Sequence, residues 1–363
     1  EIGGANMVQY VLTGPALIGT LYAFVVGTIN KSVPAKQLLI IAQVGMLAYG
    51  MIFWLLGGKA PIILLVIASG LVGLNQGSMN TLVGLMLVDV VPAEQKRGST
   101  LGIITAVMNV GGVIITTLGG MISDATGKWQ SAYVLFLYYI VAIILELFLL
   151  PNVEPEGKVA PAAAGDAPAV EGGLPIKVWL LSIHYLFFFL WLYVFGTNCS
   201  EFITRTYQIG TDADAGFAAS TITIGGVVAG VLYGAYSKVL GKLTVPFCMA
   251  LATIGLAIPV FVHSSVIGID AAGIMCGFGM MGANPYIIGY LAKVAPGAKY
   301  GKAMSVFAGF MNAGMVVAIP VLQFLAKMVS GDPQNVPAKF VIAFVGMIVV
   351  TATSPLIYCS KDK

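Results

Sequence analysis

The chain has 363 residues, of which 58% are hydrophobic and 9% are charged. Soluble domains contain about 45–50% apolar and about 25% charged residues, so this composition excludes an ordinary soluble protein. The formal net charge of +3 says little by itself, and we expect the lipid bilayer rather than a nucleic acid as the large partner.

Long apolar runs follow one another along the whole chain. A helix needs about 20 apolar residues to cross the hydrocarbon core of a bilayer. No alternating pattern of short strands is visible, so the sequence predicts an all-α polytopic membrane protein. In chain order, the predicted membrane helices are at residues 7–29, 38–56, 61–89, 99–122, 130–151, 176–203, 214–236, 244–262, 265–292, 302–326 and 337–358.

The segment 152–175, between the fifth and sixth predicted helices, is rich in Pro, Ala, Gly and Glu and predicts a flexible linker. Loops on the linker's side of the membrane carry thirteen Lys and Arg residues, and loops on the other side carry five. Cytoplasmic loops are enriched in Lys and Arg. We therefore expect a multi-pass protein of the cell membrane, in a bacterium the inner membrane, with the linker and the C-terminus in the cytoplasm.

The two halves of the chain repeat one pattern. The stretch "GSTLGIITAVMNVGG" begins at Gly98, and "GKAMSVFAGFMNAGM" begins at Gly301, so that Asn109 corresponds to Asn312. Upstream, Gly73 aligns with Gly277, and an offset of 207 residues aligns Gly27 with Gly234 and Lys31 with Lys238. The halves, 1–151 and 176–363, are therefore predicted to be parallel repeats. In this alignment Glu1 falls opposite Gln208, so we expect a twelve-helix protein whose first helix precedes this sequence.

Several local motifs resemble those of the major facilitator superfamily. That family's loop between helices two and three resembles G-x-x-x-D-R-x-G-R-K, and here Gly27, Lys31, Gly234 and Lys238 occupy corresponding positions, with lysine in place of the aspartate. "VPAEQKRGSTLG" and "GKWQSAYVLF" resemble the family's entries into helices five and six. The resemblance implies a 6+6 helix architecture, with family helices 2 to 6 in residues 1–151 and family helices 7 to 12 in residues 176–363. It also implies gating roles for the four loop residues.

In the family, helices one, four, seven and ten line a central cavity. The resemblance therefore directs attention to polar groups in predicted helices 61–89, 176–203 and 265–292. A buried amide in hydrocarbon is costly without partners, so these groups face one another or a wet cavity. The amide and phenol candidates for substrate binding are Asn75, Gln76, Asn80, Asn109, Asn284, Tyr286 and Asn312. For Asn109 and Asn312, flanked by glycines, packing between helices is an equal alternative.

The predicted helix 176–203 is rich in aromatic rings. His184, Phe188 and Trp191 share one helical face, which is a candidate cavity lining, although aromatic stripes more often serve packing. Asn198 lies in the polar stretch 196–200, where we expect a break of the kind found in discontinuous transporter helices. Glu201 and Arg205, four residues apart, are a candidate charge pair at the outer mouth.

Ionisable groups are scarce elsewhere. Glu146, one turn from the inner end of its helix, is expected to reach water there. No acidic residue falls at midplane in a predicted helix, so a coupling proton or sodium ion is left open. Two histidines and four dispersed cysteines give no basis for a metal site, a cofactor or a catalytic triad, so we predict no enzyme.

The function predicted from the sequence is a monomeric secondary transporter that moves a small organic solute by alternating access, through symport or facilitated uptake. An organic-anion or drug exporter or antiporter of the same fold is an alternative, and so is a sensor that binds without transport. An ion-translocating subunit of a respiratory complex would need a line of membrane-embedded charges, which the sequence does not contain.

Overall fold

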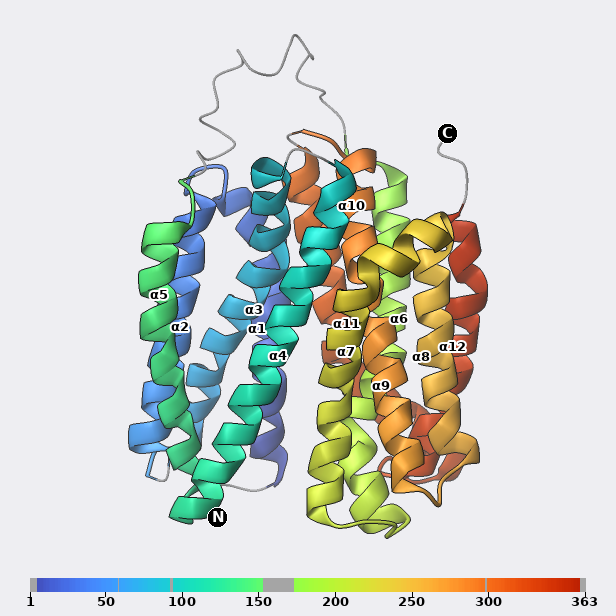
Figure 1. Ribbon diagram of the computed structural model, residues 1–363. Helices are drawn as coiled ribbons and strands as arrows, with labels where there is room; N and C mark the ends of the chain where they lie inside the picture. Colours follow the sequence, from blue (N-terminus) through green and yellow to red (C-terminus); the bar gives the residue numbers. More distant parts are fainter. Residues whose placement is uncertain (1–4, 58, 92–93, 153–172, 298, 360–363) are drawn as a thin grey trace, which may run out of the picture. The chain divides into compact units, whose positions relative to one another are not determined.

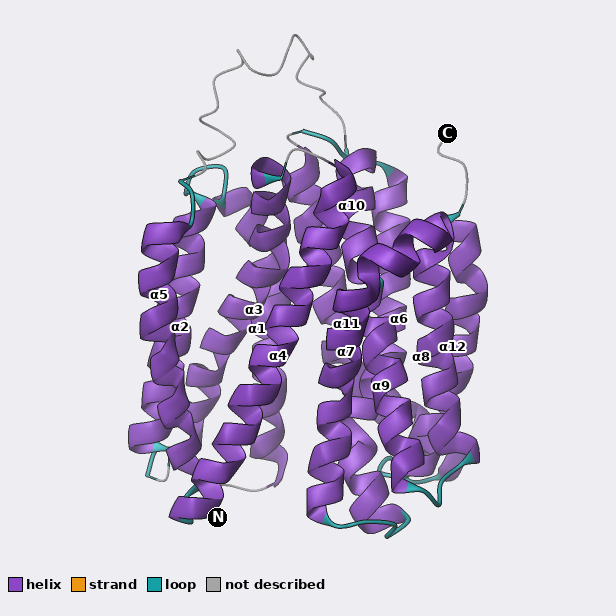
Figure 2. Ribbon diagram, in the orientation of Figure 1, coloured by secondary structure: helices purple, strands orange, loops and turns teal. Residues whose placement is uncertain are grey.

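The computed structural model describes residues 5–57, 59–91, 94–152, 173–297 and 299–359 (Figure 1). In these ranges the regular secondary structure is helical and no strand occurs (Figure 2). The elements are α1 (Ala5–Ile29), α2 (Ala35–Leu56), α3 (Ile62–Val90), α4 (Glu94–Thr126), the 3₁₀ segment η1 (Trp129–Leu137), α5 (Tyr138–Leu149), α6 (Ile176–Glu201), the π-helical segment η3 (Phe202–Thr206), α7 (Asp212–Leu240), η4 (Gly241–Leu243), α8 (Thr244–Phe261), α9 (Val266–Gly282), α10 (Asn284–Val294), α11 (Lys299–Ser330) and α12 (Val336–Tyr358).

Local sequence explains where several helices begin. Pro34 and Pro61 directly precede α2 and α3, and proline disfavours a helix that would run through it from the preceding residues. Thr211 and Asp214 form a reciprocal capping box at the start of α7. The side chain of Asn335 caps α12 by accepting a backbone N–H. These polar groups satisfy helix ends that would otherwise lack partners.

The all-α polytopic fold is confirmed for the described residues. Eight stretches among them are long and apolar enough to cross a membrane, and one of these, Asp214–Phe261, contains both α7 and α8. Two shorter apolar helices, Gly14–Ile29 and Thr100–Ile115, belong to α1 and α4. Each of the eleven predicted spans is therefore occupied by helix. The predicted linker falls largely outside the described residues.

The helices form two units, and each unit draws on both halves of the sequence. The first unit contains residues 1–92, 115–179 and 291–313. The second unit contains residues 93–114, 180–290 and 314–363. Helices α4 and α11 are each divided between the units, so the helical halves 1–151 and 176–363 are joined inside each unit.

The two repeats make the same helix contact. In the first unit, a side chain at Gly73 of α3 would collide with the carbonyl oxygen of Pro15 in α1. In the second unit, a side chain at Gly277 of α9 would collide with the carbonyl oxygen of Ile222 in α7. These residues correspond in the sequence repeat, because Pro15 and Ile222 share the offset of 207 residues. Glycine lets the helix backbones approach closely at equivalent places, as expected for parallel repeats.

Candidate functional site

The most distinctive feature of the second unit is a break in a membrane helix. The predicted helix 265–292 is two helices, because α9 ends at Gly282 and α10 begins at Asn284. Pro285 explains the break, since its ring nitrogen has no hydrogen to donate to the carbonyl oxygen of Met281. This interruption was not predicted, although the Asn-Pro dipeptide at 284–285 is a signal for it.

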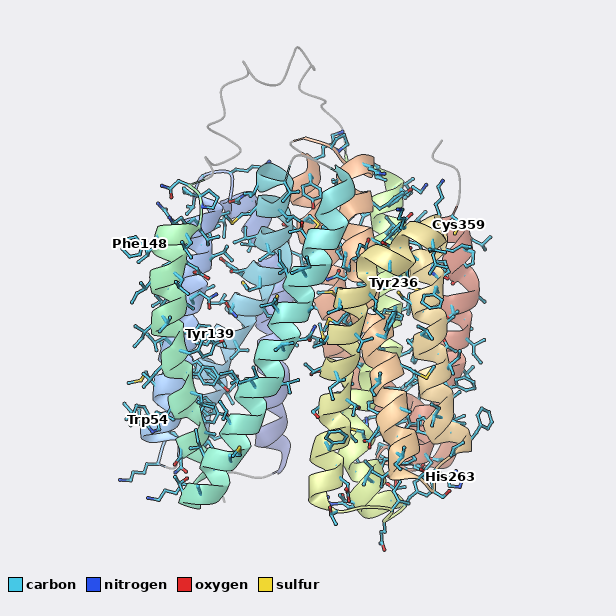
Figure 3. All side chains as sticks on the ribbon, in the orientation of Figure 1. Trp54, Tyr139, Phe148, Tyr236, His263 and Cys359 are labelled. Carbon is cyan, nitrogen blue, oxygen red and sulfur yellow. The ribbon has the colours of Figure 1, made fainter. Side chains whose placement is uncertain are left out.

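Two tyrosines fix the carbonyl groups at the break. The hydroxyl of Tyr185 in α6 donates to Met280 O at 3.4 Å, and the hydroxyl of Tyr236 in α7 donates to Gly282 O at 3.0 Å. Figure 3 labels Tyr236 on α7. A side chain at Gly282 would come within 2.7 Å of the Tyr236 hydroxyl oxygen, so it would push on the hydrogen bond that Tyr236 makes here. The break is therefore a built feature with its own hydrogen bonds.

Asn284, at the start of α10, leaves a polar atom unused. Its Oδ1 is buried and accepts no hydrogen bond. An unpaired buried acceptor costs about 1–3 kcal/mol, so such atoms are few in folded proteins. One turn onward, the rings of Tyr286 and Tyr290 stack with centroids 6.4 Å apart at an interplanar angle of 8°. An unused acceptor and aromatic rings beside an interrupted helix are the elements from which transporter sites are built.

Helix α6 runs without a break through residues 196–200, which corrects our prediction for this stretch. The polar side chains there bond to their own helix: Thr197 Oγ1 donates to Tyr193 O at 2.9 Å, and Asn198 Nδ2 donates to Val194 O at 3.1 Å. Regular helical geometry ends only at η3, after Glu201. Short polar side chains that satisfy carbonyl groups of the preceding turn are compatible with a continuous helix.

The predicted aromatic face of α6 packs largely on α12. His184 Nε2 lies 2.9 Å from Val350 O, and its Nδ1 lies 3.3 Å from the Tyr358 hydroxyl oxygen. Trp191 lies directly against Gly346 of α12. Phe188 is fully buried and stacks on Tyr185 of the same helix. These contacts give His184 and Trp191 partners on α12, a neighbour that could not be identified from periodicity alone.

A buried lysine also joins α6 to α12. Lys339 is 4% exposed, and its Nζ donates to Asn198 Oδ1 and to Gln334 Oε1, each at 3.2 Å. Glu201 and Asp332 lie near enough to interact with its charge. Burial of an ammonium group is tolerated only with such partners. This connection was not predicted, because a lysine near the start of the predicted helix 337–358 gives no sign of a partner on α6.

Replacing Lys339 with methionine is expected to lower the stability of the second unit by about 1–3 kcal/mol. Methionine fills the space of the lysine chain but leaves Asn198 Oδ1 buried without its donor. The melting temperature of the purified protein in detergent measures the effect. The control is Lys327→Met, because Lys327 is an exposed lysine near the end of α11. Equal melting temperatures for the two variants would contradict the structural role of Lys339.

Other predicted amides differ in their surroundings. Asn75 Oδ1 and both amide atoms of Asn312 are buried without a hydrogen-bond partner, and Asn312 has no exposed surface. Asn109 packs closely against Gly226 of α7, which is the packing role we considered for it.

The remaining polar residues of interest lie on α3. Gln76 lies near Gly19 of α1, and Asn80 is half-buried. The sequence analysis did not select Ser78 and Thr81 of α3, whose hydroxyl groups are also buried and unpaired.

In the first unit, α1 meets α11 at glycine positions. The backbone N–H of Gly27 donates to Ser305 Oγ at 3.1 Å, and a side chain at Gly27 would crowd the carbonyl oxygen of Gly301. Phe24 and Phe310 add an edge-to-face ring contact with centroids 5.9 Å apart. This contact joins the two repeats inside the first unit.

The second unit contains the equivalent contact, between α4 and α7. A side chain at Gly102 would lie 2.8 Å from the carbonyl oxygen of Gly230, and one at Gly230 would lie 2.5 Å from Gly102 O and 2.9 Å from Ala106 N. Gly27 and Gly230 occupy neighbouring turns of corresponding helices in the repeat. We call these two places the glycine contacts. Each brings a helix from one half of the sequence against a helix from the other half.

Three of the four predicted loop residues lie within a helix, and Gly27 belongs to α1. Gly234 and Lys238 belong to α7, which continues to Leu240, and the turn follows at Gly241 with φ of +52°. The predicted helix ended at residue 236, so α7 is four residues longer at this end than predicted. Lys31 lies in the turn after α1, as expected, and is exposed.

Glu201 and Arg205 lie on either side of the junction between α6 and η3. The π-helical geometry of η3 changes the spacing on which an α-helical (i, i+4) pair depends. Glu201 instead lies close enough to Lys339 to interact with it electrostatically, while Arg205 is exposed.

Repeated helical halves, membrane-length apolar helices and an interrupted helix with an unused polar group define a polytopic membrane protein of the transporter type. The family model of the Major Facilitator Superfamily matches residues 1–207 and 185–361. The chain belongs to this superfamily, and the resemblance noted from its motifs is confirmed.

Solved structures share the fold at low sequence identity. The human organic anion transporter MFSD10 (TETRAN) is 13% identical with a TM-score of 0.73, over 95% of this chain and 83% of that chain. The superfamily transporter FucP in the outward conformation is 13% identical with a TM-score of 0.74, over 100% of this chain and 92% of that chain. The proton:xylose symporter XylE is also 13% identical with a TM-score of 0.74, over 96% of this chain and 85% of that chain. A search of curated protein sequences finds no match.

Proposed function

We propose that this protein is a secondary transporter that moves a small polar organic solute across the cell membrane by alternating access. The observation that carries this proposal is the unused acceptor of Asn284 beside the break between α9 and α10. A solute hydroxyl or amino group would supply the missing donor. The stacked rings of Tyr286 and Tyr290 would offer apolar faces of the kind that sugar and nucleoside rings pack against.

Two amides of the first unit are further candidates for contact with the solute. Asn75 and Asn312 also keep buried amide atoms without partners, and they are proposed solute contacts. One of the similar structures is named as an organic anion transporter and another as a proton:xylose symporter. Both names agree with a small organic solute. The proposed form is a monomer. The C-terminus is proposed to lie in the cytoplasm, because the linker side carries thirteen cations against five on the other side.

An organic anion is the second candidate solute. It is favoured by the exposed cation Arg205 after α6, which would attract an anionic group from water. The similarity to a structure named as an organic anion transporter supports the same alternative. The transport assay below separates the two solute classes.

The proposal is tested by uptake into liposomes that contain the purified protein. Labelled sugars, nucleosides and carboxylates are compared, each with and without an imposed pH gradient. Saturable uptake that stops at equilibrium indicates facilitated transport, and uptake driven above equilibrium by the gradient indicates proton symport. Binding without uptake for every solute would contradict the transporter and indicate a sensor.

Substituting Asn284 with alanine is expected to weaken solute affinity about 5- to 100-fold, the equivalent of one lost hydrogen bond at 1–3 kcal/mol. Because Oδ1 has no partner within the protein, the melting temperature should change little. Isothermal titration with the transported solute measures the affinity. The matched control is Asn198→Ala, which removes an internally bonded amide and should lower stability with less effect on affinity. Unchanged affinity in Asn284→Ala would remove this residue from the site.

A further inference from the structure

Helices α2 and α5 of the first unit run side by side (Figure 1). A hydrogen bond between side chains joins them. Gln43 of α2 is 5% exposed, and its Nε2 donates to Glu146 Oε1 of α5 at 2.9 Å. We had expected Glu146 to extend to water. Instead its carboxyl group turns toward α2, while nearby Phe148 points outward with 83% of its surface exposed (Figure 3).

The second oxygen of each group has no partner. Glu146 Oε2 and Gln43 Oε1 are both buried, and neither accepts or donates a hydrogen bond. An ionised carboxylate can only accept, and so can an amide oxygen, so the charged form of Glu146 cannot satisfy either atom. A single proton on the carboxyl group converts one of the two acceptors into a donor. A carboxylic acid and a primary amide can then exchange two hydrogen bonds.

The charged groups around this pair do not neutralise a carboxylate. Lys36 of α2 directs its Nζ to the carbonyl oxygens of Leu147 and Leu150, at 2.7 Å and 2.9 Å. It thereby closes the C-terminal end of α5, a common role for lysine. Tyr139, on the same helix as Glu146, interacts with it electrostatically.

Further along the interface, Tyr49 of α2 and Tyr133 of η1 contact each other, with ring centroids 5.8 Å apart. The described groups that interact with Glu146 are thus the Gln43 amide and the Tyr139 phenol, while Lys36 is engaged with backbone carbonyls at the end of α5. A neutral side chain fits these surroundings and a bare carboxylate does not.

We propose that Glu146 and Gln43 form a proton-binding site between α5 and α2. The carboxyl group takes one proton from water, and its O–H donates to Gln43 Oε1 while Gln43 Nε2 donates to Glu146 Oε1. Release returns the proton to water and leaves a negative charge facing the amide oxygen. Proton binding therefore strengthens the packing of α5 on α2. This inference does not depend on transport or on the identity of a solute.

Infrared difference spectroscopy of the full chain in liposomes at neutral pH tests the site. The expected result is a carbonyl stretch of a protonated carboxylic acid in the wild type that shifts in D₂O and is missing from Glu146→Gln. In Gln43→Leu the same band should move to the frequency of a free acid or disappear. If the wild type and Glu146→Gln show identical spectra in this region, the carboxyl group is ionised and the proposal is wrong.

Thermal unfolding at a series of pH values provides an independent test. Because the folded protein holds a proton that the unfolded chain releases, the melting temperature of the wild type should fall as the pH is raised through deprotonation of the site. Glu146→Gln keeps an amide pair with Gln43 and should match the protonated wild type with less dependence on pH. Glu146→Ala should be less stable throughout. The same pH dependence in the wild type and in Glu146→Gln would assign the titration to other groups and overturn the proposal.

Discussion

Replacing Gly277 with valine is expected to destabilise the second unit by about 1–3 kcal/mol or more, and to prevent folding if α9 and α7 cannot separate. The added side chain would occupy the position of the Ile222 carbonyl oxygen, and the nearest atoms are all backbone, which cannot rotate away. The equivalent change Gly73→Val should act in the same direction in the first unit, where it meets Pro15 O. Yield of monodisperse protein and melting temperature in detergent measure both effects.

Gly289→Val is the matched control for these variants. Gly289 lies in α10, and a side chain there would meet no atom within 4 Å. The melting temperature of Gly289→Val should stay near that of the wild type. The difference in helix propensity between valine and glycine is small, whereas a collision with backbone atoms is costly. If Gly277→Val is as stable as Gly289→Val, the close α7–α9 contact and its equivalence to α1–α3 are not as described.

Valine at Gly27 is expected to reduce the initial rate of solute uptake at least tenfold while solute binding persists. The new side chain would displace Ser305 Oγ and crowd Gly301 O, so the glycine contact between α1 and α11 could not close. A carrier that cycles between two arrangements of its repeats needs such contacts to form and separate. Gly102→Val should have the same effect at the second glycine contact, against Gly230.

Two controls accompany the measurement of uptake and affinity. Gly111→Val changes a glycine of α4 that has open space around it, and its uptake should remain normal. Ser305→Ala removes the hydrogen bond from Gly27 N–H without adding volume, so it should have a smaller effect than valine at Gly27. Normal uptake by Gly27→Val and Gly102→Val would show that the glycine contacts take no part in the transport cycle.

Much of the fold could be predicted because the bilayer imposes a simple rule on apolar length. Each predicted span contains helix, and the repeat of Asn109 and Asn312 is matched by equivalent contacts at Gly73 and Gly277. Helix breaks were harder to predict. The polar stretch 196–200 looks like an interruption, but its side chains bond to carbonyl oxygens of the preceding turn and α6 continues through it. Pro285, in contrast, interrupts a largely apolar span at residue 283. Proline in membrane helices is common, so its presence alone does not decide between a kink and a break.

The partners of the candidate site residues could not be read from the sequence. Periodicity placed His184 and Trp191 on one face of α6 but could not show that α12 covers them. Gln43 drew no attention because its partner Glu146 is 103 residues away in the chain. By contrast, the polarity of Asn75, Asn284 and Asn312 was sufficient to select them, because an amide among apolar residues is conspicuous before any partner is known.

The most direct test of the transporter account is solute counterflow in liposomes that contain the full-length protein. Liposomes are loaded with an unlabelled solute that the uptake panel has identified, and the labelled solute is added outside at low concentration. A carrier that alternates access is expected to accumulate the label transiently above its external concentration, and Asn284→Ala should require more solute for the same effect. Label that never exceeds the external concentration, from protein that binds the solute, would contradict alternating access as the function of this chain.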